Sequence, residues 1–352
     1  MRERVNELRA NLSARLGVAV VLGVGLILLA VAASFGSLII QREATIMLIN
    51  VVLVVGIYSF SGLSGILSFG HVSFMAIGAY ATALVTIPAT QKASLLPDLP
   101  GFIGSVELAA LPALAVIIAC TLVFAALVAV PIMRLSGGAA TIATFALLLV
   151  VHTVASNWEQ VTRGQLTMIG VPTDTTLTTA AVGAVVTVIV VALFQSSRVG
   201  LRLRASREDE YAAQGLGVNL RRDRFAAWML SAALMAGGGL LYAQFLGSFN
   251  PDAFYIGITF TLIAMLVVGG LKSLSGAVTG VVVISVITYL LRQVEDGAIG
   301  STFARSGLLE VSLALIMLAI LILRRQGLLG VHEFGLPKFR RDKSRQADQP
   351  DG

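Results

Sequence analysis

Residues 61–74 read SGLSGILSFGHVSF and place one of only three histidines among four serines. A serine hydroxyl beside an imidazole can act as a nucleophile with its general base, which is the chemistry of acyl transfer. That chemistry also needs a third group to orient the base, and His71 has no carboxylate near it in the sequence. The chain has no GxSxG nucleophile elbow and no HExxH zinc motif. These serines and His71 are therefore not predicted to be a catalytic set.

The chain offers few residues that could hold a metal ion or a nucleotide. Its other two histidines, His152 and His332, lie far from His71 in the sequence, and Cys120 is its one cysteine. This spacing argues against a metal site, and a single cysteine excludes an intramolecular disulfide bond. The nearest match to a phosphate-binding loop is GGLKS at 269–273, which lacks the glycine spacing that lets backbone N–H groups cradle phosphate. We therefore expect the chain to bind no cofactor itself.

The composition is that of a membrane protein. Of the 352 residues, 57% are hydrophobic and 12% are charged, whereas an ordinary soluble domain has about 25% charged residues. A chain of this kind is expected to cross the bilayer many times as helices, because a helix satisfies its backbone hydrogen bonds internally. We therefore predict an all-α polytopic membrane protein, and we expect no nucleic-acid partner.

Ten apolar segments are long enough to be membrane spans. They cover residues 17–40, 44–61, 66–87, 108–130, 139–155, 178–194, 225–246, 256–270, 276–291 and 308–323. The first resembles a signal peptide, since LAVAAS at 29–34 is similar to a signal-peptidase site. Because its apolar run is longer than a signal peptide needs, we expect it to be retained as the first span.

The basic residues predict the orientation of these spans. With the N-terminus in the cytoplasm, 20 of the 25 lysines and arginines fall on cytoplasmic segments, as the positive-inside rule requires. We therefore predict that both termini are cytoplasmic, with residues 1–16 as a tail and residues 17–323 as the transmembrane domain. Residues 324–352 are basic and lack apolar periodicity, so we expect a disordered cytoplasmic tail. Its bases could contact anionic lipid or stay solvated.

Residues 195–224 form the longest polar segment between spans, and we place it in the cytoplasm. The run REDE at 207–210 predicts the start of a short helix, since acidic residues favour the positive end of a helix dipole. Gly215 and Gly217 predict its end. Two alanines in between could let another protein approach this helix closely. A solvated connecting loop is the alternative.

Two longer stretches point to a family. One reads GLSGILSFGHVSFMAIGAY at 62–80, and the other reads ASREDEYAAQGLGVN at 205–219, followed by MLVVGGLKSLSGAVTG at 265–280. In this order and spacing they resemble the inner-membrane permease of bacterial ATP-binding-cassette (ABC) importers for branched-chain amino acids. The likeness covers most of residues 44–290. The chain departs from the family pattern at four positions, which leaves the transporter class intact and the exact solute open: Tyr58, Ile66, Thr261 and Lys272.

The resemblance implies a function and a set of partners. The chain is expected to be a multi-pass permease in the bacterial cytoplasmic membrane, not an enzyme, that translocates a branched-chain amino acid or related small polar solute. An extracytoplasmic solute-binding protein would deliver the solute, a homologous second permease subunit would complete the membrane core, and two ATPase subunits would use ATP and Mg. The loop that docks into the ATPase corresponds here to Arg207, Glu208, Asp209, Glu210, Ala212, Ala213 and Gly217.

Glycines and serines predict where the spans break. Gly62, Gly65 and Gly70 each weaken a helix by about 1 kcal/mol relative to alanine, and small residues let neighbouring backbones approach closely. Broken helices in transporters flank the solute site, and residues 269–276 have the same composition. A tight turn with packing glycines is the alternative. If these breaks line the path of the solute, eight residues are assigned to the translocation path: Gly62, Ser64, Gly65, Ser68, Gly70, His71, Gly269 and Gly270.

Two rival hypotheses belong to other classes of protein. A secondary transporter driven by an ion gradient needs ionisable residues within its spans, and here Glu310 at a span end is the best candidate. An intramembrane enzyme needs a convergent set of Ser and His, paired Asp or metal ligands, which the sequence does not present. The importer permease is the main hypothesis, and the ion-driven transporter is its alternative.

Overall fold

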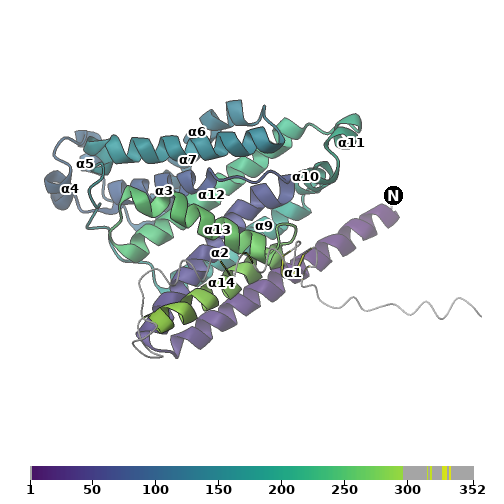
Figure 1. Ribbon diagram of the computed structural model, residues 1–352, viewed down its shortest axis with the longest axis horizontal. Helices are drawn as coiled ribbons and strands as arrows, with labels where there is room; N and C mark the ends of the chain where they lie inside the picture. The colour runs from purple at the N-terminus through teal and green to yellow at the C-terminus, as the bar shows by residue number, and fades with distance from the viewer. Residues whose placement is uncertain (1, 296–314, 316–317, 319–326, 331–332, 334–352) are drawn as a thin grey trace, which may run out of the picture.

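The computed structural model describes residues 2–295, 315, 318, 327–330 and 333. Within this part of the chain, every regular element is a helix (Figure 1). The expected all-α class is therefore confirmed. The helices are α1 (Arg2–Ser34), α2 (Leu38–Ser64), α3 (His71–Thr86), α4 (Ala89–Leu95), α5 (Gly101–Gly104), α6 (Ala110–Ile132), α7 (Gly137–Asn157), α8 (Glu159–Thr162), α9 (Leu177–Ser196), α10 (Arg198–Glu208), α11 (Glu210–Gly215), α12 (Leu220–Leu246), η1 (Pro251–Phe254), α13 (Ile256–Gly269) and α14 (Leu274–Glu295).

Among the described residues, eight helices are long and apolar enough to cross a membrane. A ninth span is present if α3 and α4, which are bent by 116° at a short break, count as one. These nine correspond to nine of the ten predicted spans, and the tenth, at 308–323, lies outside the described residues. The multi-pass architecture is confirmed, whereas the total of ten stays a prediction.

The structure describes the backbone of the predicted N-terminal tail but little of the predicted C-terminal tail. The backbone of residues 2–16 continues α1 as helix, and their place in a cytoplasmic tail stays a prediction. A run of arginines and polar residues between apolar ones can extend a span beyond the bilayer, because helix propensity does not depend on hydrophobicity. The C-terminal tail, 324–352, lies largely outside the described residues.

Helix α2 is the centre of the bundle. Its side chains from Ala44 to Ser64 are buried almost without interruption, and it packs against α9, α12 and α14. A helix that is apolar all round is one that other helices surround. Ser37 caps its start by accepting a hydrogen bond from the backbone N–H of Ile40, which satisfies one of the unpaired donors of the first turn.

Helices α3 and α12 pack backbone to backbone. Gly78 lies against the backbone of Ala236, and Gly239 lies against the backbone of Met75, so neither position has room for a side chain. Small residues join membrane helices in this way, because close van der Waals packing replaces the hydrophobic effect inside a bilayer. The two helices therefore pack closely as a pair, and α12 also packs against α2.

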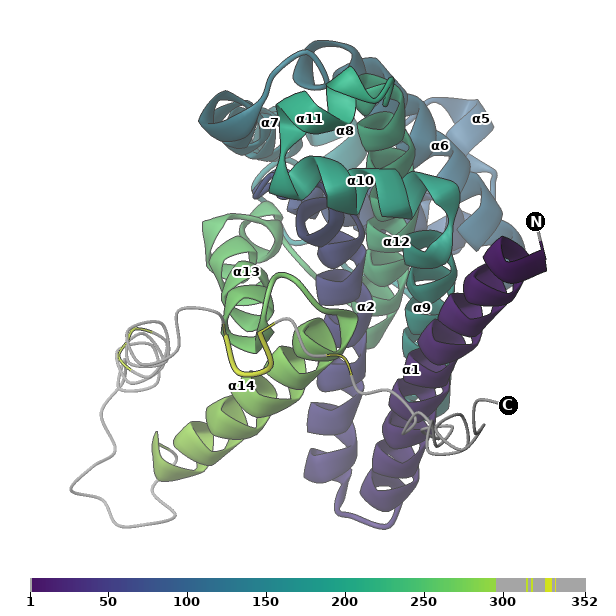
Figure 2. The same cartoon turned by 90° about the vertical axis from the view of Figure 1, so that its right-hand side faces the viewer.

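The bundle has two ends that differ in charge. One end holds α10, α11, the α6–α7 turn and the α13–α14 turn, and we call it the α10–α11 end (Figures 1 and 2). The opposite end holds α4, α5 and the α1–α2 turn (Figure 1). Arginines and lysines gather at the α10–α11 end, with seven arginines between 198 and 224, and Arg134 and Lys272 in the neighbouring turns. By the positive-inside rule, this charge distribution favours a cytoplasmic α10–α11 end.

Candidate functional site

Helices α2 and α3 are separated by an unwound segment, residues 65–70, near the α10–α11 end. Gly65 ends α2 with a φ of 77°, a left-handed conformation that favours glycine. Serine side chains supply partners for the backbone that follows. Ser64 Oγ accepts from the N–H of residue 66 at 3.3 Å, and Ser61 Oγ accepts from the N–H of Ser68 at 3.2 Å. The sequence thus places polar side chains where the helix ends.

Helix α7 holds the unwound segment in place. The Thr141 hydroxyl donates to the carbonyl of Leu67 at 2.9 Å, and the Thr144 hydroxyl accepts from the N–H of Phe69 at 3.3 Å. Gly70 lies against the backbone of Thr144, where a Cβ would approach the carbonyl oxygen to 2.6 Å. The break is therefore an ordered structure, with its backbone groups bonded to a neighbouring span.

His71 opens α3 and is completely buried. Its Nδ1 lies 2.7 Å from Ser68 Oγ, and its ring packs against Phe60, Phe74 and Trp228 with centroid distances of 5.2, 5.8 and 4.8 Å. In a continuous helix, Ser64, Ser68 and His71 would lie on one face, but the backbone before His71 is unwound, so this polar face is not formed. For this residue the geometry favours the packing-turn alternative over a water-filled path.

The remaining predicted path residues meet at the α10–α11 end. Gly62 and Gly65 line a hollow of about 210 Å³, whose other walls include Arg207 and the α13–α14 turn at 271–272. Gly269 ends α13. Gly269 packs against the backbones of two glycines of α14, and Gly270 follows with a φ of 128°. The predicted second break is thus the turn between two spans, and it lies against the end of α2 rather than inside a span.

The polar segment 195–224 folds into two short helices that lie across the end of the bundle (Figure 2). Asp209 separates them and caps α11, since its Oδ1 accepts from the N–H of Ala212 at 2.9 Å. Our expectation that residues 207–210 open one helix is wrong for Arg207 and Glu208, which end α10. A capping aspartate needs extended backbone, and that requirement divides the run.

Helix α11 presents an exposed surface with apolar side chains. Tyr211 is 87% exposed and Leu216 is 86% exposed. Ala212 is exposed, but Ala213 is buried in its own chain. Only one of the two alanines is therefore free to contact a partner. The helix ends at Gly215, one of the two glycines that predicted its end, and Gly217 follows with a φ of 82°.

Arg207 and Glu208 connect α10 to the spans. Arg207 Nη1 donates to the carbonyl of Gly62 at 2.7 Å. Arg207 Nη2 also lies 3.2 Å from Glu208 Oε1, and the same carboxylate oxygen is 3.5 Å from Lys272 Nζ in the α13–α14 turn. The Arg207 guanidinium, which hydrogen-bonds to Glu208, and the Lys272 ammonium hold the pKa of the Glu208 carboxyl below its usual range. One small network thus joins α10, the end of α2 and the α13–α14 turn.

Two further ion pairs fasten the segment to α12. Arg202 makes a bidentate contact with Asp223 through bonds of 2.6 and 2.7 Å. Arg224 donates to Glu210 at 2.9 Å, which ties α11 to the same helix. The Asp223 and Arg224 side chains are nearly buried, and paired charges in such positions fix orientation more than exposed pairs do. The segment is thus attached to the bundle at several points.

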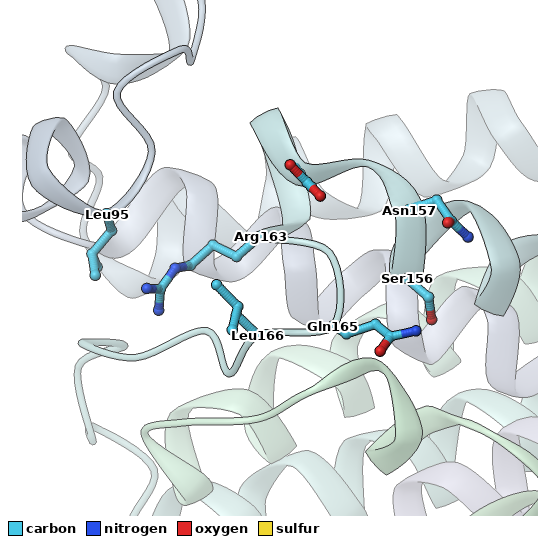
Figure 3. Close-up of a pocket in the computed structure, with 7 residues that line it drawn as sticks. Leu95, Ser156, Asn157, Arg163, Gln165 and Leu166 are labelled. Carbon is cyan, nitrogen blue, oxygen red and sulfur yellow. The ribbon is translucent and has the colours of Figure 1, made fainter.

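The opposite end of the bundle has a polar hollow that the sequence did not reveal (Figure 3). Its volume is about 470 Å³. In Figure 3, the Arg163 side chain extends toward Leu95, and Ser156, Asn157 and Gln165 lie on the other side of the hollow. The predicted spans leave these residues in the segments that connect them, and the sequence could not show the hollow because the residues come together through tertiary contacts. The lining residues are Leu95, Ser156, Asn157, Glu159, Arg163, Gln165 and Leu166.

Lys92 is a second feature of this end that sequence reasoning missed. It is 1% exposed, and its Nζ donates to the carbonyls of Leu84 at 2.9 Å, Ile103 at 3.3 Å and Val106. A lysine in a segment between two predicted spans is ordinarily solvated. Here the ammonium binds three carbonyls and so joins the end of α3 to α5 and the segment that follows it.

A bundle of many apolar helices, with short polar helices attached across one end, is the architecture of a multi-pass membrane protein, and a broken helix within it is a feature common in transporters. The sequence matches the family model described as "Branched-chain amino acid transport system / permease component" over residues 39–323. The chain belongs to this family.

Individual relatives show the same likeness. A probable branched-chain amino acid transport permease protein LivH of Methanocaldococcus jannaschii is 33% identical over 141 residues, which is 40% of this chain and 43% of the relative. The high-affinity branched-chain amino acid transport permease LivM of Escherichia coli is 27% identical over 320 residues, or 81% of this chain and 69% of the relative. The probable ABC transporter permease YphD of Escherichia coli is 37% identical over 116 residues, or 30% and 35%. The chain thus spans less than half of the LivH and YphD proteins. No solved structure matches it.

Proposed function

We propose that the chain is the membrane-spanning subunit of an ABC importer and that it translocates a branched-chain amino acid or a related small solute. Family membership supports the permease class, and the names of the LivH and LivM relatives support the solute. The observation that supports the mechanism most directly is the attachment of α10 to the helix break through Arg207 and Gly62. A protein that moves α10 can move the broken helix through this contact.

The ATPase would dock on α10 and α11. The exposed Tyr211 and Leu216 side chains suit insertion into a groove of another protein. Docking then acts on the spans through the network of Arg207, Glu208 and Lys272. ATP and Mg are bound by that partner, in line with the absence of a phosphate-binding loop from this sequence.

Two other partners follow from the same proposal. Relatives named LivH and LivM both match this chain, which supports a homologous second permease subunit in the membrane core. The polar hollow at the opposite end lies on the face where an extracytoplasmic solute-binding protein would dock (Figure 3). A charged, recessed surface of this kind suits a transient partner.

Uptake measurements test the proposed energy source. Right-side-out vesicles that hold the whole complex receive radiolabelled leucine, isoleucine or valine, with the solute-binding protein outside and ATP inside. We expect uptake that requires both and that persists when ionophores dissipate the proton and sodium gradients. Uptake that does not require ATP and stops when the ion gradients are dissipated would establish the secondary transporter instead.

Cysteine labelling tests the orientation. In a Cys120→Ser background, single cysteines at the exposed positions Asp98, Gln165 and Ala205 are treated with an impermeant thiol reagent in intact cells. We expect labelling at positions 98 and 165 from outside, and labelling at 205 only after the cells are opened. Labelling of position 205 in intact cells would refute a cytoplasmic α10–α11 end.

A further inference from the structure

Three phenylalanine rings from three separate elements meet beside the helix break. Phe69 of the unwound segment contacts Phe145 of α7 at a centroid distance of 5.9 Å and Phe260 of α13 at 5.7 Å, both edge to face. Phe260 is 51% exposed, and the other two rings are partly exposed. This aromatic cluster therefore has a face that the chain itself does not cover.

The aromatic cluster lies within the membrane-spanning layer. At a rise of 1.5 Å per residue, Phe145 and Phe260 are about 12–14 Å from the ends of α7 and α13 at the α10–α11 end. Two helical turns further along α7, His152 stacks on Tyr255 at 3.7 Å and hydrogen-bonds to Asp252 at 3.1 Å. The seam along α7 thus meets polar groups of η1 and Tyr255 toward the opposite end, and it meets Phe69 and, through it, Phe260 at the break.

The other end of the seam is polar as well. The hollow beside Gly62 and Gly65 lies there, with the Arg207 and Lys272 side chains in its wall. The order along this side of the molecule is therefore polar, aromatic, polar. This order suits a path for an amino acid. Polar surface keeps the charged amino and carboxylate groups hydrated or paired, and aromatic surface contacts the hydrocarbon side chain.

This side of the molecule is unsuited to lipid contact. Gly65 is exposed, and the unwound backbone around it is partly exposed, whereas irregular backbone within a bilayer is tolerated only against protein or a water-filled cavity. At the far end of the seam, the Asp252 side chain is 77% exposed. Broken helices flank the solute site in transporters, so the partly exposed rings adjoin the path rather than the bilayer.

We propose that Phe69, Phe145 and Phe260 form the apolar subsite that contacts the hydrocarbon side chain of the transported amino acid and so determine solute selectivity. The proposal rests on the proposed function. Rigid aromatic rings bury an aliphatic side chain with little loss of their own conformational freedom. One methylene in such a site changes selectivity by about tenfold or more.

Selectivity of uptake tests the subsite in vesicles that hold the whole complex, with ATP inside and binding protein outside. We expect Phe145→Ala and Phe260→Ala to lower the ratio of leucine to valine uptake by about tenfold, because the larger side chain loses more contact. Phe35→Ala, which removes an 87% exposed ring in the α1–α2 turn, is the matched control and should leave the ratio unchanged. An unchanged ratio in both test variants would overturn the subsite. If vesicles with the unsubstituted complex show no ATP-driven uptake, the proposed function itself is refuted.

Thiol accessibility separates the subsite from a surface that contacts lipid or the second permease. In a Cys120→Ser complex, Phe145→Cys and Phe260→Cys are expected to react with a small water-soluble methanethiosulfonate, and leucine transport is expected to slow the reaction. Leu127→Cys, at a 68% exposed apolar position of α6, should react at least tenfold more slowly. Reaction rates equal to that of Leu127→Cys would show that the rings face lipid or protein, and would overturn the proposal.

Discussion

Arg207 Nη1 donates a 2.7 Å hydrogen bond to the backbone carbonyl of Gly62, which joins the end of α10 to the last turn of α2. The last residues of α2 precede the unwound segment, so the bond connects the exposed polar helices to the broken span. The Arg207 side chain is mostly buried, and its hydrocarbon stem lies over Gly65. One side chain thus contacts both the end of α2 and the first residue of the break.

Arg207→Met should uncouple ATP hydrolysis from transport. Methionine keeps a hydrocarbon stem over Gly65 but removes the guanidinium. A hydrogen bond from a charged group contributes about 1.5–3 kcal/mol, so we expect uptake per ATP hydrolysed to fall by about tenfold or more. The assay compares ATPase rate and leucine uptake in the same vesicles. Arg221→Met, at an exposed position on α12, is the control, and equal coupling in the two variants would contradict the role of Arg207.

Gly65→Ala should destabilise the permease for two reasons. A φ of 77° strains an alanine by about 1–2 kcal/mol, and its Cβ would lie 2.6 Å from Cγ of Arg207, which adds an overpacking cost of about 1–3 kcal/mol. Gly217→Ala separates the two effects, because Gly217 has a φ of 82° with open space around it. Heat-induced aggregation of the purified complex, followed by size-exclusion chromatography, should show the larger loss for Gly65→Ala. Equal losses would mean that the Arg207 side chain moves away from the new methyl group with no loss of stability, and would contradict the overpacking cost.

The spans could be predicted from the sequence because bilayer crossing depends on a local property, the length of an apolar run. Nine predicted segments correspond to helices or to the bent pair α3–α4. The helical backbone of residues 2–16 could not be predicted in this way, since a polar helix has no apolar run. The division of residues 207–210 between two helices was missed for a similar reason. The cap at Asp209 depends on side-chain geometry rather than on composition.

The candidate site was predictable only where its signal is local. Glycine and serine composition predicted a break after the span at 44–61, but the unwound residues are 65–70, most of which we had placed in the next span. Acidic residues followed by glycine predicted α11. The contact of Arg207 with Gly62 joins residues far apart in the chain, and periodicity contains no information about such pairs. Burial of Lys92 against three carbonyls is likewise a tertiary effect.

Lys92→Met should lower stability although the residue lies in a connecting segment. The substitution preserves the length of the side chain but leaves the partly buried carbonyls of Leu84, Ile103 and Val106 without their shared donor. An unsatisfied buried acceptor costs about 1–3 kcal/mol, so we expect a measurable loss of stability even though these carbonyls are only partly buried. Lys272→Met removes an ion pair between exposed side chains, which contributes little to stability, and serves as the control. Thermal midpoints that agree within error would contradict a structural role for Lys92.

His71→Leu tests the two interpretations of the serine-rich stretch. The imidazole is enclosed by Phe60, Phe74 and Trp228, and its Nδ1 is bonded to Ser68. Leucine retains the bulk but leaves the Ser68 hydroxyl buried without its partner, a loss of about 1–3 kcal/mol. We therefore expect less assembled complex in the membrane, with an uptake rate per complex within about twofold of normal.

The double variant Ser68→Ala with His71→Leu distinguishes a buried hydrogen bond within a packing turn from a contact with the solute. Replacing both partners of a buried hydrogen bond by apolar groups is far less costly than removing one. The double variant should therefore recover part of the complex that His71→Leu loses, as measured by quantitative immunoblotting and thermal unfolding. A residue that contacts the solute would behave differently, because the second substitution would lower uptake further without restoring stability. A normal amount of complex with strongly reduced uptake in His71→Leu would place His71 in the translocation path and reject the packing turn.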